Sequence, residues 1–248
     1  MTNARRLVLL VLLLLPLAGC TGLFGWLAYL PKHHTIASFA TSLRLRAPSQ
    51  VHNARLAASA LDGAVIPPGS EFSFNQTVGP WTADEGYRKA PVSYSGDPIL
   101  DWGGGVCQTS TTLYNAALLA GMTILERHRH HWPAKYAPVG QDAAVAYPNI
   151  DLRFRNDLDA PLRVSANISG ELLVVELHSC AAAPQVSLEN QILAITPPAT
   201  VVEVQANRRF SPPTRGQPGY EVVVYRKRLD NSADREIISR DTYPPRNH

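Results

Sequence analysis

A cysteine stands at the start of a helix-like run that follows three glycines. Residues 103–121 read GGGVCQTSTTLYNAALLAG, so Cys107 lies where a predicted helix begins and Gly121 lies just past its end. Unpaired N–H groups and the positive dipole end of a helix N-terminus favour the thiolate, which is the reactive form. The glycines allow unusual backbone conformations and a close approach by a substrate. The stretch suits a nucleophile, and a tight packing turn would look the same.

A thiol nucleophile needs a base, and the base needs a group that holds it. The downstream stretch ERHRHHWPAKYAPVGQDAAV supplies candidates. If this piece is extended, His128 and His130 share one face and His131 faces the other way. Asp142 follows and could fix the tautomer of a histidine, as the third member of such triads does. The order Cys–His–Asp predicts an α+β fold of papain-like or transglutaminase-like arrangement, with a central cysteine-bearing helix packed on an antiparallel sheet.

Acyl transfer or amide hydrolysis is the chemistry that this set of residues would perform. Cys107 would attack the carbonyl carbon, His130 would act as base and then as acid, and Asp142 would orient it. The backbone N–H of Cys107 and the side chain of Gln108 would stabilise the oxyanion.

Purely structural roles for the same residues stay open at this point. Outside the cytoplasm Cys107 and Cys180 could form a disulfide, or Cys107 could simply pack. The histidines could be polar surface groups with Trp132 packing beneath them. Zinc has little support because the chain has no HExxH or paired CxxC spacing, so we expect no metal and no other cofactor.

The N-terminus predicts export from the cytoplasm. After MTNARR the chain runs LVLLVLLLLPLAGC, and its ending Leu17-Ala18-Gly19-Cys20 resembles the lipobox of bacterial lipoproteins. That resemblance implies a signal peptide over residues 1–19 and lipid on Cys20. The alternative is an uncleaved anchor, because the apolar run continues to Leu30 and is long enough to span a bilayer. Both alternatives place the rest of the chain outside the cytoplasm and beside a membrane.

Composition excludes one class of partner. The formal net charge of +3 includes two arginines of the signal sequence, so the mature chain has no basic stripe and we expect no nucleic acid partner. The chain has 20 prolines, which indicate turns and extended pieces. We expect a membrane-proximal tether over 20–50, a main domain over 51–180, and a linker with a small C-terminal β appendage over 181–248.

Several elements follow from local patterns. A helix is predicted over 51–63 and a second over 107–120. A strand is predicted to place Phe72 and Phe74 on one face, and residues 162–180 read as a hairpin that turns at Ser169-Gly170. After Cys180, two β-like runs, YEVVVYRKRL and REIISRDTY, form the expected appendage.

Two long stretches carry a family resemblance. PPGSEFSFNQTVGPWTADEGYRKAPV and the stretch from GGGVCQTSTTLYNAALLAG to YPNIDLRFRN resemble the VanW family of bacterial envelope proteins, collinearly over residues 51–167. The resemblance implies an envelope location and a site rather than a particular reaction. For the proposed chemistry we expect the peptide part of peptidoglycan as substrate, and the cell wall as partner. Two departures are His131, where the family usually has serine, and Cys180, which has no family counterpart.

The resemblance also implies site residues beyond the proposed triad. These binding positions are Phe74, Gly103, Gly104, Gly105, Ser110, Tyr114, Asn115, Arg127 and Tyr136. A rival interpretation is a non-catalytic wall-binding or scaffolding module tethered to the membrane, in which Cys107 only packs. Its contact surface would comprise Phe72, Phe74, Trp81, Tyr87 and Trp102.

Overall fold

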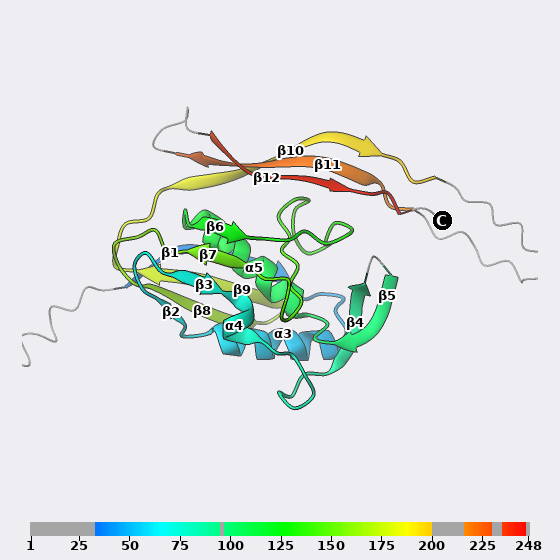
Figure 1. Ribbon diagram of the computed structural model, residues 1–248, viewed down its shortest axis with the longest axis horizontal. Helices are drawn as coiled ribbons and strands as arrows, with labels where there is room; N and C mark the ends of the chain where they lie inside the picture. The colour runs from blue at the N-terminus through cyan, green and yellow to red at the C-terminus, as the bar shows by residue number, and fades with distance from the viewer. Residues whose placement is uncertain (1–32, 95–96, 200–215, 230–234, 247–248) are drawn as a thin grey trace, which may run out of the picture. The chain divides into compact units, whose positions relative to one another are not determined.

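The computed structural model describes residues 33–94, 97–199, 216–229 and 235–246. The predicted signal peptide, the lipidation site Cys20 and the alternative anchor lie outside these residues. Within the described ranges, no helix has the length and apolar character needed to cross a membrane. The described chain is a mixed α+β structure with more strand than helix and several antiparallel sheets (Figure 1).

A four-stranded antiparallel sheet forms the base of the domain. Its strands are β1 (His34–Ser42), β2 (Val65–Ile66), β8 (Leu162–Ser169) and β9 (Leu172–Ser179). They are ordered β1-β9-β8-β2. The hairpin predicted at Ser169-Gly170 is confirmed, because β8 and β9 pair in register across that turn.

The first strand of this sheet corrects the tether expected over 20–50. Residues 34–42 pair with β9, from His34 opposite Ser179 to Ser42 opposite Leu172. Only Ala37 and Thr41 of β1 are buried, so the alternation of apolar residues that marks a half-buried strand is weak in this segment. The domain therefore begins near residue 34 rather than near residue 51.

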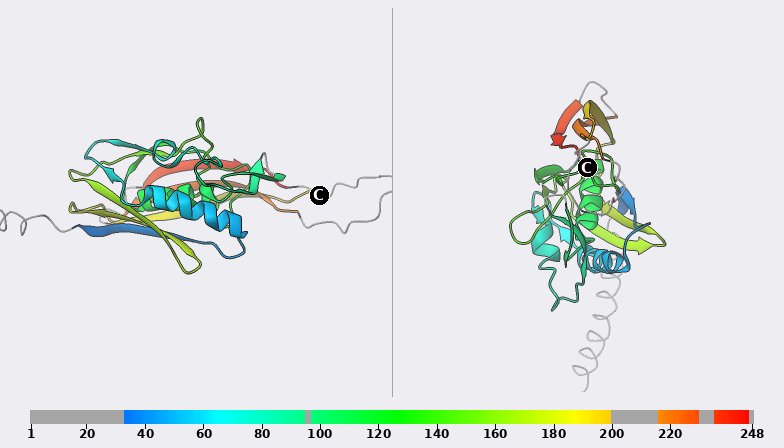
Figure 2. Two further views of the ribbon diagram at one scale, coloured as in Figure 1. Left: turned by 90° about the horizontal axis from the view of Figure 1, so that it is seen from below. Right: turned by 90° about the vertical axis from the view of Figure 1, so that its right-hand side faces the viewer.

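Both predicted helices are confirmed, and they pack on this sheet and on each other (Figures 1 and 2). They are α3 (Pro48–Leu61) and α5 (Val106–Leu119). The buried residues of α3 are mostly alanines, which lets the two helices approach closely. Nearly all of α5 is buried, including four consecutive hydroxyl residues, Thr109–Thr112. Such polar groups need hydrogen-bond partners inside the protein.

A second small sheet corrects the placement of one phenylalanine. It consists of β3 (Glu71–Ser73), β7 (Arg153–Arg155) and β6 (Thr123–Glu126), in the order β3-β7-β6. Phe72 lies in β3 and stacks on Phe154 with a centroid distance of 4.8 Å. Phe74 does not continue that strand, because Ser73 accepts a hydrogen bond from the Gln76 N–H and so begins α4 (Phe74–Val78). β4 (Lys89–Tyr94) and β5 (Asp97–Trp102) form a separate hairpin.

The expected C-terminal appendage is a three-stranded sheet that packs on the domain. It consists of β10 (Val186–Thr196), β11 (Gly219–Arg228) and β12 (Arg235–Tyr243). The sequence patterns predicted two of these strands and missed β10, which has no fully buried residue. Arg226 of β11 donates to the Met122 carbonyl oxygen at 2.8 Å, just beyond the C-terminal end of α5. The residues after Cys180 are therefore an integral part of the described structure.

The three glycines bring α5 into close contact with its surroundings. Gly105 is the N-cap of α5 and has a φ of 111°, in the left-handed region. A Cβ atom at this position would lie 2.2 Å from the Gln50 carbonyl oxygen. At Gly103, with a φ of 77°, a Cβ atom would lie 2.1 Å from the ring of Trp81. Gly103 and Gly105 are therefore required by packing and by backbone conformation together.

We expect Gly105→Ala to lower the free energy of unfolding by about 3 kcal/mol or more, because strain and a backbone clash add. Urea denaturation measures this quantity. Gly170→Ala is the matched control, since Gly170 also has a positive φ but no atom within 4 Å of its added Cβ. It should cost only about 1 kcal/mol. Equal losses in the two variants would show that the approach of Gln50 is unimportant.

Candidate active site

Cys107 is the second residue of α5 and its side chain is half-buried. In its protonated form the thiol donates to the Val145 carbonyl oxygen, with a sulfur–oxygen distance of 3.4 Å. The backbone N–H groups of Val106 and Gln108 are bonded to Gly103 and Gly105 respectively. Among the described residues, the N–H of Cys107 has no acceptor. A free N–H beside the sulfur is suitably placed to stabilise an oxyanion.

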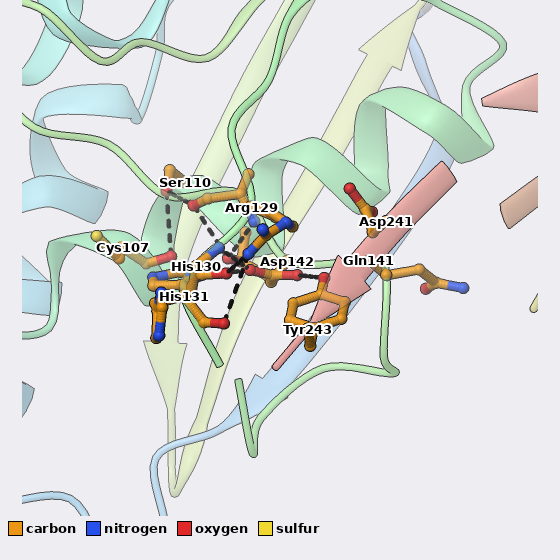
Figure 3. Close-up of polar contacts among 12 residues, drawn as sticks. Cys107, Ser110, Arg129, His130, His131, Gln141, Asp142, Asp241 and Tyr243 are labelled. Carbon is orange, nitrogen blue, oxygen red and sulfur yellow. Dashed lines mark hydrogen bonds and ion pairs between the residues drawn. The ribbon is translucent and has the colours of Figure 1, made fainter. Parts of the chain in front are cut away.

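His130 and Asp142 lie opposite each other on two antiparallel segments. A β-bridge joins His128 to Ala144, and His130 and Asp142 follow two residues away on the two segments. The Nδ1 atom of His130 lies 2.6 Å from Oδ2 of Asp142, and the His130 backbone N–H donates to the same oxygen at 2.6 Å (Figure 3). Because a carboxylate only accepts, Nδ1 carries the proton and Nε2 is left for a second partner.

The thiol and the imidazole shift each other's pKa. Burial alone would raise the pKa of Cys107, but the interaction with His130 outweighs burial and lowers it. Burial alone would lower the pKa of His130, whereas the contacts with Asp142 and Cys107 raise it to about 10. Both shifts favour a thiolate–imidazolium pair over the neutral pair. This ionisation state makes a cysteine nucleophilic without removal of a proton at the moment of attack.

Asp142 is only 1% exposed, and its carboxylate is surrounded by donors. Besides the two bonds from His130, it accepts one from the Tyr243 hydroxyl at 2.5 Å and one from Arg127 at 3.2 Å. Burial would raise the pKa of Asp142, but the hydrogen bond and charge of His130, together with Arg127, hold it at about 2. The carboxylate is therefore charged at all pH values relevant to catalysis.

The buried polar residues of α5 hold the segment that carries Asp142. Ser110 donates to the Ala143 carbonyl oxygen at 2.7 Å, and Asn115 donates to the Gln141 carbonyl oxygen at 2.8 Å. Thr111 accepts from the Ala143 N–H at 3.0 Å. The helix that presents the thiol thus also fixes the backbone on both sides of Asp142. Ser110 and Asn115, which the resemblance implied as binding residues, have this supporting role in the structure.

Gln108 is the one proposed catalytic residue that points away from the site. Its side-chain amide donates to the Thr41 hydroxyl at 3.0 Å and to the Ser42 carbonyl oxygen at 2.9 Å. Both of its N–H donors are therefore used to attach α5 to β1. The expectation that this amide stabilises an oxyanion is not met, because the side chain is committed to the sheet.

The other residues implied by the resemblance have different surroundings. Phe74 is fully buried, with its ring edge-on to Trp81, and so does not form a binding surface. Tyr114 is also buried and lies beneath the guanidinium of Arg127. Tyr136 is half-buried. Burial, followed by the charge of Cys107, raises its pKa, so its phenol stays protonated. Of these three aromatic residues, only Tyr136 has a pKa that responds to the charge of Cys107.

The structure also distinguishes the three histidines. His128 contacts the Glu126 carboxylate at 3.0 Å and is largely exposed. His131 lies against the Trp132 ring, with a centroid distance of 5.1 Å. Only His130 contacts Asp142, and 19% of its side chain is accessible. The substitution of serine by His131 therefore leaves the identity of the candidate base unchanged.

Cys107 and Cys180 are both free thiols, so the disulfide alternative is not realised. Within the described ranges, no group of three or more His, Cys, Asp or Glu side chains is arranged to hold a metal ion. The aromatic surface required by the binding-module alternative is largely absent, because Phe72, Phe74 and Tyr87 are buried. Of the aromatic residues named for it, Trp102 is 38% exposed.

Sequence reasoning missed two residues that reach the site from β12. Asp241 and Tyr243 alternate along this strand and are both buried against the domain. The run REIISRDTY predicted only a strand. An aspartate among the inward-facing positions of a strand was the available signal, because buried carboxylates require a partner.

We expect Cys107 to be alkylated by iodoacetamide at a lower pH than a free cysteine, which has a pKa of about 8.5. The physical reason is that His130 lowers the thiol pKa and remains protonated itself up to about pH 10. Peptide mapping by mass spectrometry at each pH reports Cys107 alone. In His130→Gln the profile should move to higher pH, toward that of the urea-denatured control. Superimposed profiles of folded and denatured protein would contradict this.

The low pKa of Asp142 predicts a loss of stability in acid. Its value of about 2 lies below the unfolded value of about 3.9, so its contribution is complete above about pH 5 and is lost as the pH falls toward 2. His130 is protonated in both states over this range and adds no slope. Wild-type protein should lose about 2 kcal/mol more than Asp142→Asn between pH 5 and pH 2. Urea titrations measure this, with exposed Asp159→Asn as the control that should follow wild type.

Comparison with known proteins supports the family suggested by the motifs. A region of the chain, residues 49–178, matches the family model described as VanW like protein. The uncharacterized protein YoaR of Bacillus subtilis (strain 168) is 40% identical over 131 residues, which cover 53% of this chain and 43% of that protein. The vancomycin B-type resistance protein VanW of Enterococcus faecalis (strain ATCC 700802 / V583) is 31% identical over 136 residues, covering 53% and 50%.

The chain spans about half the length of the curated relatives it matches, or somewhat less. No solved structure matches it. The matched residues 49–178 include α5 with Cys107 and the two segments that carry His130 and Asp142. They make up slightly more than half of the chain, and the chain therefore belongs to the VanW family.

Proposed function

We propose that the protein is a cell-envelope enzyme that performs thiol-dependent acyl transfer or amide hydrolysis on a peptidoglycan-type peptide. The observation that carries this proposal is the assembly of Cys107 with the His130–Asp142 pair at the N-terminus of α5. Each member has the environment that its role requires. The thiol is partly accessible, the imidazole has Nε2 available, and the carboxylate is buried and charged.

The reaction would begin with attack of the Cys107 thiolate on the carbonyl carbon of an amide. The negative charge that develops on the carbonyl oxygen would be stabilised by the Cys107 backbone N–H. The His130 imidazolium would donate its Nε2 proton to the leaving amine as the carbon–nitrogen bond breaks, which leaves a thioester on Cys107. Neutral His130 would then take a proton from water or from an acceptor amine that attacks the thioester. Water gives hydrolysis and an amine gives acyl transfer.

The local architecture supports this mechanism. A helix N-terminus carries the thiol, and antiparallel segments carry the base and the group that orients it, which is the division of roles in a papain-like or transglutaminase-like arrangement. Tyr136 is a further candidate for the site, since its pKa responds to the charge of Cys107 and its protonated phenol can donate a hydrogen bond. The tyrosine would contact the substrate or its oxyanion in place of Gln108.

The proposed substrate follows from the proposed location. The lipobox-like ending at Cys20, or the alternative anchor, would hold the folded region at the outer side of a membrane, where the peptides of the cell wall supply amide bonds. One relative is named a vancomycin resistance protein, and this name is in keeping with work at the cell envelope. The peptidoglycan peptide is therefore the first substrate class to test.

Cys107→Ala should abolish turnover of isolated muropeptides, with a loss of about 10³-fold or more, because the nucleophile is removed. Liquid chromatography with mass spectrometry would follow the released or exchanged amine. Cys180→Ser is the matched control, as the other free described thiol, and it should keep wild-type activity. Equal turnover by Cys107→Ala and wild type would rule out the proposed nucleophile. If wild type and Cys107→Ala both bind wall fragments normally and neither turns them over, the non-catalytic module would be favoured.

A further inference from the structure

The C-terminal sheet contacts the carboxylate that orients the candidate base. Oδ2 of Asp142 faces His130, while Oδ1 accepts a hydrogen bond from Tyr243 of β12 at 2.5 Å. Tyr243 is 1% exposed, so water does not compete for this contact. Figure 3 shows the tyrosine and His130 on opposite sides of the Asp142 carboxylate.

A second residue of the same strand acts on Asp142 through an arginine. Asp241 binds Nη1 of Arg127 with both carboxylate oxygens, at 2.8 and 2.7 Å. The same guanidinium donates to Oδ1 of Asp142 at 3.2 Å and to its backbone carbonyl oxygen at 2.6 Å. Arg127 thus binds two buried carboxylates. The negative charge of Asp241 partly offsets the positive charge of Arg127, which weakens the electrostatic effect of Arg127 on Asp142.

The sheet is attached to the segment that carries Asp142 at further points. Asn190 of β10 accepts from the Gln141 side chain and donates to the Val139 carbonyl oxygen, both at 2.5 Å. Val222 and Val224 of β11 pack so closely on Gly140 that an added Cβ would lie 2.8 Å from the nearest methyl group. All three strands therefore contact residues 139–142.

We propose that the C-terminal sheet is part of the active site and that Tyr243 and Asp241 are positioning residues that set the orientation and effective charge of Asp142. Both residues lie outside the region that matches the family model, 49–178. The inference rests on the proposed function, since it assigns these residues to the triad proposed there. Under this proposal, residues 49–178 alone do not contain the complete site.

The two residues should act on the His130–Cys107 pair in opposite directions. The Tyr243 hydroxyl directs the positive end of its dipole at Asp142 and partly offsets the carboxylate charge. Without the hydroxyl, the negative charge of Asp142 acts more strongly on His130 and Cys107. The pKa values of Cys107 and His130, which set the two limbs of the pH profile of Cys107 reactivity, then both rise. Removal of the Asp241 charge lets the positive charge of Arg127 act more strongly on Asp142. Both limbs of the profile then move to lower pH. A purely structural role would not give opposite signs.

The experiment compares wild type, Tyr243→Phe and Asp241→Asn as full chains in detergent. Two readouts are the pH profile of Cys107 alkylation and the NMR titration of the His130 imidazole, assigned with His130→Gln. We expect an upward shift of about half a pH unit for Tyr243→Phe and a downward shift of similar size for Asp241→Asn. The plateau rate of alkylation should fall several-fold in Tyr243→Phe, because Asp142 is held less firmly.

Tyr220→Phe is the matched control. Tyr220 lies opposite Tyr243 in the β11–β12 pairing, and its hydroxyl has no hydrogen bond within the described residues. It should leave both readouts unchanged. Profiles that superimpose on wild type, or that shift in the same direction in both variants, would overturn the inference. If one variant fails to fold, the sign of the shift in the other decides.

The two proposals fail in distinguishable ways. Opposite shifts of the His130 titration without turnover of any muropeptide would leave the positioning role standing and remove the proposed substrate. Turnover that depends on Cys107, together with unshifted titrations in both β12 variants, would keep the enzyme and remove the role of the sheet.

Discussion

The buried carboxylate of Asp142 is the group on which the rest of the site depends. A carboxylate in the protein interior is stable only when its charge and its lone pairs are matched by donors. Here it accepts four hydrogen bonds, two from His130 and one each from Arg127 and Tyr243. The contacts from His130 and Arg127 lower the pKa of Asp142, and the contact with Asp142 raises the pKa of His130. The hydrogen bonds that stabilise the buried charge of Asp142 therefore include the one that orients His130 for its proposed role.

The polar face of α5 shows why a helix rich in threonine is stable at the centre of this domain. Its hydroxyl and amide side chains bond to β1 on one side and to residues 141–143 on the other. These contacts replace the water that the buried groups lose, and they hold the Asp142 segment at a fixed distance from the thiol. The positions that the family resemblance implied for binding are, at Ser110 and Asn115, residues of this internal network.

The sequence predicted the parts of the structure that depend on local patterns. The two helices, the hairpin at Ser169-Gly170 and the Cys–His–Asp order all follow from periodicity, turn chemistry and residue type. The first strand escaped prediction because so few of its side chains are buried, and Phe74 was misplaced because Ser73 ends the strand as a cap. Asp241 and Tyr243 were missed for another reason. Their partners are about a hundred positions away, and no local pattern encodes such pairings.

The position of β12, about a hundred residues after Asp142 along the chain, has a consequence for biosynthesis. During synthesis the N-terminal parts of a chain are available to fold first, so the helix with Cys107 and the Asp142 segment can come together before β12 has been made. At that stage the donor from Tyr243 and the counter-charge from Asp241 are both missing. The arrangement described here thus becomes complete only after β12 has been synthesised and has joined the domain. Before that point, the His130–Asp142 pair beside the thiol lacks these two contacts.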